Sequence, residues 1–144
     1  MDYTELAMAF MEKMYMLNKA RPQKEMNESM RGESFVIRLL DFQGGSVQPS
    51  EISATMGISS ARIAAALNSL ERKGLITRRI DPSDRRRILV DLTDAGKVTA
   101  EEQRLAMLAH TSRMFSILGE ENAKEYVRLT GILADYAAQH MNHK

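Results

Sequence analysis

The segment from Pro49 to Gly74 (PSEISATMGISSARIAAALNSLERKG) constrains the possible fold more than any other part of this chain. Pro49 suits the first position of a helix, and Gly57 ends that helix. Ser59 is a good N-cap for a second helix, which Gly74 terminates. Two helices joined by a short turn that contains glycine are typical of a helix-turn-helix, so we predict that motif here.

Two β-rich segments follow the second helix directly, LITRRI at 75–80 and ILVDLT at 88–93. The stretch between them is DPSDRRR, and its proline and aspartates provide turn chemistry, so we expect residues 81–87 to form a loop. A basic hairpin directly after a helix-turn-helix predicts a winged helix, with the hairpin as its wing. A further brief strand is expected at Val47.

Amphipathic helices are expected around this unit, because apolar residues recur at helical spacing in 3–17, 33–42, 95–116 and 120–140. The helices at the two ends of the chain lie outside the compact winged helix. Their apolar faces must be buried against something, and a second copy of the chain is the simplest partner. The residues that we expect at this dimer interface are Tyr3, Leu6, Phe10, Leu129, Leu133 and Tyr136.

The predicted fold class is therefore mostly α-helical with a small β-hairpin wing. Residues 33–93 form the winged helix-turn-helix domain, and residues 1–32 and 94–144 form a helical dimerisation region. No apolar run approaches the ~18 residues that a membrane span needs. The apolar N-terminus also contains acids, which argues against a signal peptide. We therefore expect no membrane partner and a cytoplasmic location.

Charge is distributed unevenly along the chain, although the formal net charge is only +1. Residues 72–87 contain seven basic residues and two acids, a net charge of +5, so the rest of the chain carries −4. Such an imbalance can steer a polyanion towards one face of a protein. A charged run is more often only a solvated loop, and the charge count alone leaves both interpretations open.

Three stretches resemble the MarR (multiple antibiotic resistance regulator) family of bacterial transcription factors: PSEISATMGIS, LERKGLITRR and DPSDRRRILVDLTDAG. The resemblance follows the order of elements along nearly the whole chain and is sharpest at 48–96. It implies a homodimer in which the two ends of each chain intertwine. It also implies that two winged helices read a pseudo-palindromic operator in double-stranded DNA, often as a repressor that a small ligand releases.

The resemblance assigns roles to the residues of the loop at the tip of the wing. It implies that Asp84 fixes the wing and its arginines, and that Arg86 enters or lines the minor groove, where negative potential is concentrated. Arg85 and Arg87 are expected to contact phosphates. A salt bridge within the wing, with no role in DNA binding, is the alternative.

The recognition helix is expected at 59–73, with Ser60, Arg62, Ala65 and Asn68 towards the DNA. Ser60 can bond a base edge or a phosphate, and Arg62 can make a bidentate contact to guanine. Ser59 belongs to the same DNA-binding set, although a capping role suits it better. Many family members carry a polar or basic residue where Ala65 stands, so we expect sparse base readout by this helix.

A small apolar or acidic effector is the expected signal, because a chain without cysteine cannot sense oxidants through a thiol. In the family, the effector pocket lies between the dimer helices and the DNA-binding domain. Methionines could line such a pocket, with an arginine to meet an acid, although each methionine could equally be core. The candidates are Met14, Arg21, Met26, Met30, Arg38 and Met107.

Other functions are less well supported by the sequence. His110 stands alone, and His140 and His143 lie near the C-terminal end, so we expect no metal site, although a metal-responsive regulator remains an alternative. No phosphate-binding glycine loop and no catalytic motif is present, so we expect neither a cofactor nor an enzyme. A winged helix that binds another protein is the second alternative, which the IAAAL run keeps open.

Overall fold

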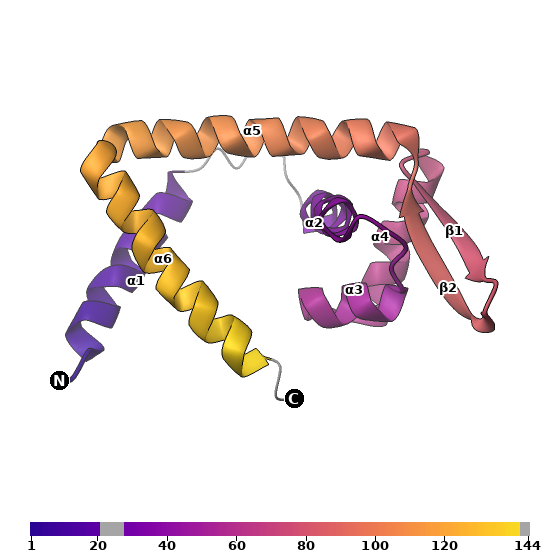
Figure 1. Cartoon of the computed structure of the whole chain (residues 1–144), viewed down its shortest axis with the longest axis horizontal. Helices are drawn as coiled ribbons and strands as arrows, with labels where there is room; N and C mark the ends of the chain where they lie inside the picture. Colours follow the sequence, from indigo (N-terminus) through magenta and orange to yellow (C-terminus); the bar gives the residue numbers. More distant parts are fainter. Residues whose placement is uncertain (21–27, 142–144) are drawn as a thin grey trace.

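The computed structural model describes residues 1–20 and 28–141, in which helices flank a two-stranded hairpin (Figure 1). Helix α5 runs along one side of the molecule, with the hairpin at its start and the terminal helices α1 and α6 at its far end. Residues 28–92 are called the winged-helix lobe below. The elements are α1 (Thr4–Lys19), α2 (Glu28–Gln43), α3 (Pro49–Met56), α4 (Ser60–Arg72), β1 (Ile76–Asp81), β2 (Asp84–Leu92), α5 (Asp94–Leu118) and α6 (Glu120–Met141).

The winged-helix lobe has its own hydrophobic core. Helix α4 contributes Ile63, Leu67 and Leu70, which recur at helical spacing and are 1% exposed. Burying one such side chain contributes about 1.5–3 kcal/mol, so this stripe holds α4 firmly against the lobe. The other members of the core are Val36, Ile37, Leu40, Val47, Ile52, Ile76 and Val90 of the lobe, together with Ala100 of α5.

Helix α2 begins earlier than its apolar periodicity suggests. The sequence predicts a helix at 33–42 and leaves 23–31 open between a short helix and a loop. In the structure, residues 28–31 belong to the same helix, which starts at Glu28. Glutamate, methionine and arginine favour helix, and their preference outweighs the single Gly32 in this stretch. Residues 21–27 lie outside the described part of the chain.

The hairpin turn is much shorter than expected, and the predicted loop at 81–87 is wrong. Strand β2 begins at Asp84, so that Pro82 and Ser83 alone make the turn. The Asp81 carboxylate closes it by accepting hydrogen bonds from the Ser83 backbone N–H at 2.9 Å and from the Ser83 hydroxyl at 2.7 Å. The three adjacent arginines therefore lie on a strand, where successive side chains point to opposite faces.

The brief strand expected at Val47 is confirmed. Val47 forms an isolated antiparallel bridge with Val90, through backbone hydrogen bonds of 3.1 and 2.8 Å. Strand β2 therefore has β1 on one side and Val47 on the other. This pairing anchors the inner end of the wing in the core, while the turn extends away from it (Figure 1).

The terminal helices lie outside that core, as the sequence predicts. Neither α1 nor α6 contains a buried residue, and all six residues expected at a dimer interface are at least 48% exposed. Across residues 1–20 and 28–141, no helix is long and apolar enough to cross a membrane.

Candidate nucleic-acid interface

Helix α4 presents a small-residue surface at its N-terminal end. The Ser59 hydroxyl accepts a hydrogen bond from the Arg62 backbone N–H at 3.3 Å, which makes Ser59 the N-cap. Ser60, Arg62 and Ala65 are exposed in the first turns of this helix. The cap fixes where the helix begins and pairs one of the backbone N–H groups of its first turn.

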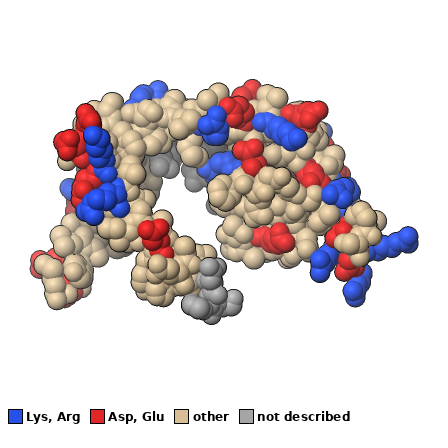
Figure 2. Space-filling view, in the orientation of Figure 1, with Lys and Arg blue, Asp and Glu red and all other residues tan. Residues whose placement is uncertain are grey.

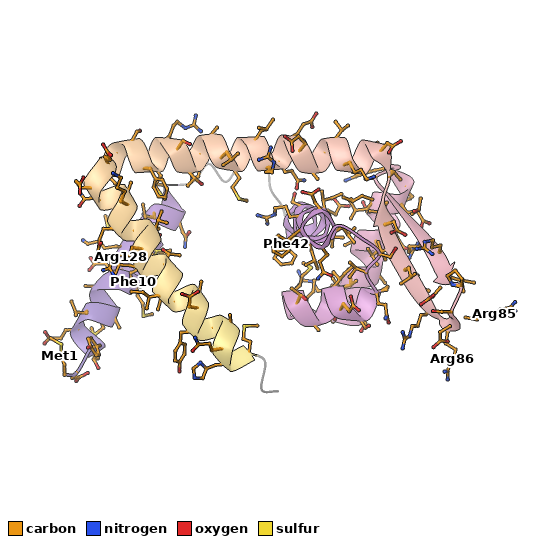
Figure 3. All side chains as sticks on the ribbon, in the orientation of Figure 1. Met1, Phe10, Phe42, Arg85, Arg86 and Arg128 are labelled. Atoms are coloured by element: carbon orange, nitrogen blue, oxygen red, sulfur yellow. The ribbon has the colours of Figure 1, made fainter. Side chains whose placement is uncertain are left out.

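The wing tip carries arginines that a single carboxylate organises. Asp84 accepts from the backbone N–H of Arg86 at 3.0 Å and from its Nε at 3.3 Å. The second oxygen of Asp84 lies 3.5 Å from Nε of Arg87. The Arg86 side chain is nevertheless 92% exposed, and Arg85 and Arg86 point in different directions away from the protein (Figure 3).

Basic residues nearer the core make contacts within the protein. The Nζ atom of Lys73 lies 2.9 Å from Oε2 of Glu33, and Nε of Arg79 lies 3.0 Å from Oδ2 of Asp91. These acids neutralise Lys73 and Arg79, whereas at the turn three arginines lie beside two acids, Asp81 and Asp84. Figure 2 shows lysine and arginine atoms projecting at the tip of the hairpin.

Asn68 has a different environment from the one the sequence suggests. Its side-chain oxygen accepts a hydrogen bond from Nη2 of Arg78 on β1 at 2.7 Å. The same guanidinium bonds Glu71 through Nε at 3.0 Å. Sequence reasoning counted Arg78 among the basic residues but missed this link, because no periodicity relates a helix position to a strand position across the intervening turn.

A cavity of about 440 Å³ lies between α2 and the outer face of α4, with Glu33, Arg62, Ala65, Ser69 and Arg72 among its lining residues. Burial raises the pKa of Glu33, but hydrogen bonds from Ser69 and Lys73 more than offset this effect and leave the pKa below its ordinary value. An ionised acid therefore ties α2 to the C-terminal end of α4. Sequence reasoning did not find this contact either.

The residues predicted for an effector pocket are not brought together at this cavity. Met14 and Met107 lie on different helices and are 38% and 48% exposed. Arg38 is exposed, with its guanidinium carbon 5.7 Å from the centre of the Phe35 ring. Arg21 and Met26 lie outside the described residues, and the side chain of Met30 is not described. The predicted pocket stays a prediction.

The histidines show no arrangement that holds a metal among the residues described. Nδ1 of His140 lies 2.8 Å from the backbone oxygen of Tyr136. The imidazole ring of His140 stacks on the Tyr136 ring, with 4.0 Å between the ring centroids. His110 is exposed on α5, and His143 lies outside the described residues. Within 1–20 and 28–141, no group of three or more histidine and acidic side chains is placed to bind an ion.

Comparison with known proteins supports the expected family. The model of the MarR family matches residues 31–87. The HTH-type transcriptional repressor MdtR of Bacillus subtilis is 34% identical over 121 residues, which cover 80% of this chain and 77% of MdtR.

Solved structures agree with this result. The YusO protein from Bacillus subtilis is 30% identical, with a TM-score of 0.67 over 94% of this chain and 99% of that chain. The transcriptional repressor CouR, bound to a 23-mer DNA duplex, is 32% identical, with a TM-score of 0.58 over 69% of this chain and 71% of that chain. Sequence identity over most of its length and the shared winged-helix architecture show that the chain belongs to the MarR family.

Proposed function

We propose that this protein is a sequence-specific, double-stranded DNA-binding transcription regulator, acting as a homodimeric repressor that a small-molecule effector releases. The observation that carries the proposal is the wing tip, where Asp84 holds the exposed Arg86 beside two further arginines. Three guanidinium groups on the hairpin that follows a helix-turn-helix suit a phosphate backbone and a narrow minor groove. MdtR and CouR are both named as transcriptional repressors, which supports this role.

Helix α4 would enter the major groove while the wing follows the backbone to the adjacent minor groove. Ser60 and Arg62 offer polar groups to the bases or phosphates, whereas Ala65 offers a methyl group alone. Ser59 is engaged as a cap, and Asn68 is bonded to Arg78. Base readout by the helix is therefore sparse. Phosphate contacts and recognition of DNA shape together supply more of the binding free energy than contacts to base edges do.

A second copy of the chain would cover the exposed apolar faces of α1 and α6. Leu6, Phe10 and Leu133 are all more than 60% exposed in one chain, which is unfavourable for large apolar side chains in water. A dimer would also supply two reader helices for a two-fold symmetric operator. An effector that favours a dimer with the wrong reader spacing must weaken DNA binding by the same free energy as DNA weakens effector binding.

The proposal assigns the protein no catalytic activity and places it in the cytoplasm, with the DNA. A protein-binding winged helix is the competing function, and salt dependence separates the two. Binding to DNA should weaken with a log–log slope of about −0.9 per phosphate contacted. A protein partner would not be expected to show this slope.

The test is a gel shift on fragments around the protein's own gene, across a salt series, with wild type and Arg86→Ala side by side. We expect the variant to lose about 1–3 kcal/mol of specific binding free energy. Arg104→Ala is the matched control, since it also removes one arginine but lies on α5, away from the wing tip (Figure 1). An Arg86→Ala protein that binds as tightly as wild type would contradict the proposed role of the wing.

The sparse-readout hypothesis has its own test in operators with single base changes. We expect small penalties at major-groove positions and larger ones where the minor groove faces the wing. Large penalties clustered under α4 instead would show that the helix reads bases directly.

A further inference from the structure

A three-residue link joins the reader helix to the wing. The guanidinium of Arg78 on β1 donates from Nε to Oε2 of Glu71 at 3.0 Å, and from Nη2 to Oε1 of Glu71 at 3.3 Å. The same Nη2 donates to Oδ1 of Asn68 at 2.7 Å. Asn68 and Glu71 lie three positions apart on α4, so they face the same side, and the planar fork of an arginine spans both.

The link lies at the point along β1 where apolar packing of the wing against the lobe ends. On β1, Ile76 is buried, whereas Ile80, four residues nearer the turn and on the same face, is 64% exposed. Arg78 lies between them. A two-stranded hairpin has little stability of its own in water, so the direction of its outer half depends on such contacts.

We infer that Arg78 is a positioning residue which, through Asn68 and Glu71, holds the wing at a set angle to α4 and so places Arg86 on the DNA. The inference rests on the proposed function and names three residues that help it without reading DNA themselves. Asn68, which the sequence suggests as a base reader, then acts on the wing instead.

A small change in the angle between the wing and α4 displaces Arg86, because Arg86 lies far from the link. Arg78 pairs with Val90 across the hairpin, and Arg86 lies four residues nearer the turn on β2. At about 3.3 Å per residue, Arg86 is about 13 Å beyond the link, so a swing of about 10° moves its backbone by about 2 Å. A shift of that size exceeds the tolerance of a hydrogen bond to a phosphate or a base edge.

The charges in the link also argue against direct DNA binding by Arg78. Hydrogen bonds from Arg78 lower the pKa of Glu71, so that this carboxylate stays ionised and neutralises the guanidinium. An acid on the reader helix repels DNA, and its presence there needs a compensating benefit. Holding the wing in place is such a benefit.

The positioning role of Glu71 and the charge of Glu71 predict opposite changes in DNA affinity when this residue is replaced. Glu71→Ala removes a negative charge from the reader helix, which by electrostatics alone should tighten DNA binding. We expect it to weaken specific binding instead, by about tenfold or less, because the wing is released. Glu51→Ala is the matched control, since Glu51 is an exposed acid on α3 of the same lobe, and we expect unchanged or tighter binding. Tighter binding by Glu71→Ala would overturn the inference.

A double-mutant cycle tests whether Arg78 acts through Arg86. Arg78→Gln should weaken binding in the wild-type protein and have little effect in Arg86→Ala, whereas Arg78→Lys, which keeps one ion pair but loses the fork, should be intermediate. Additive losses, within about twofold, would show independent roles and refute the inference.

A measurement without DNA separates this inference from the proposed function. The chain has no cysteine, so spin labels can be placed at Ala61→Cys on α4 and Arg85→Cys at the wing tip, with labelled protein diluted into unlabelled protein. Arg78→Gln should broaden the distance distribution between the two labels. An unchanged distribution refutes the inference. A broadened one, in a protein that binds no DNA, supports the link and overturns the DNA-binding function alone.

Discussion

Replacing Gly96 by alanine should destabilise the protein where α5 meets the end of the winged-helix lobe. A Cβ atom at Gly96 would lie 2.0 Å from the backbone oxygen of Leu75 and 3.0 Å from a methyl carbon of Leu92. Real Cβ atoms essentially never approach closer than 3.0 Å, so the first turn of α5 must move away by about 1 Å or more. Glycine is needed here for close approach, whatever its backbone angles.

The magnitude follows from the bonds at this junction. The Thr93 backbone N–H donates to the oxygen of Leu75 at 3.1 Å, and the Thr93 hydroxyl donates to the oxygen of Gly74 at 2.6 Å. Moving α5 weakens both bonds, each worth about 1 kcal/mol, and overpacking adds about 1–3 kcal/mol. Alanine recovers about 1 kcal/mol of helix propensity, which leaves a net loss of about 2–3 kcal/mol in the free energy of unfolding.

The assay is urea unfolding followed by circular dichroism, at one fixed protein concentration because association adds to stability. Gly32→Ala is the matched control, since its Cβ would meet no atom within 4 Å and the site is helical. We expect the control to equal wild type or to gain up to about 1 kcal/mol. If Gly96→Ala behaved like the control, the close approach to Leu75 would not constrain the fold as we argue.

Three further variants test other contacts. Thr93→Val removes the cap of α5 and the bond to Gly74, and should cost about 1–2 kcal/mol in the same urea assay, so wild-type stability would contradict the capping role. The pKa of Glu33 is lowered in the folded protein, so its contribution to stability is complete above its ordinary pKa of 4.5 and is lost as pH falls through the folded value. The melting temperature of Glu33→Gln should therefore fall less steeply than that of wild type as the pH is lowered below 4.5. An equally steep fall in the two proteins would show that Glu33 does not contribute to the pH dependence. Leu6→Asp with Phe10→Asp should give monomers by analytical ultracentrifugation, and an intact dimer would mean that the interface lies elsewhere.

Local features of the fold could be predicted from the sequence because their causes are local. Gly57 has a φ of 66° and ends α3, as its position after an apolar helical stretch suggests. Ser59 caps α4, and Pro49 occupies the first turn of α3. The sequence leaves the cap of α5 open between Thr93 and Asp94, and the structure shows Thr93 in that role. Each of these depends on a few neighbouring residues, whose backbone preferences survive in any fold that keeps the helices.

The candidate site was predictable only in part. The family pattern points to Asp84 beside Arg86, and the structure places the two in contact. The DNA contacts of Ser60, Arg62 and the three wing arginines stay predictions, as do the dimer interface and the effector pocket. Their partners are other molecules, and the amino-acid sequence of one chain carries no direct record of them.

The sequence by itself therefore determined the order of elements, their stops and caps, and the place where positive charge gathers. Tertiary structure decided which partners those charges meet within the protein. Arg78 and Arg79 look alike in the sequence as neighbours on one strand, yet alternation sends Arg78 to Glu71 and Asn68 on α4 and Arg79 to Asp91 on β2. The close approach of Gly96 to Leu75 and the two-residue turn before Asp84 are of the same kind. Each joins groups whose meeting depends on how whole elements pack, and no local preference encodes that.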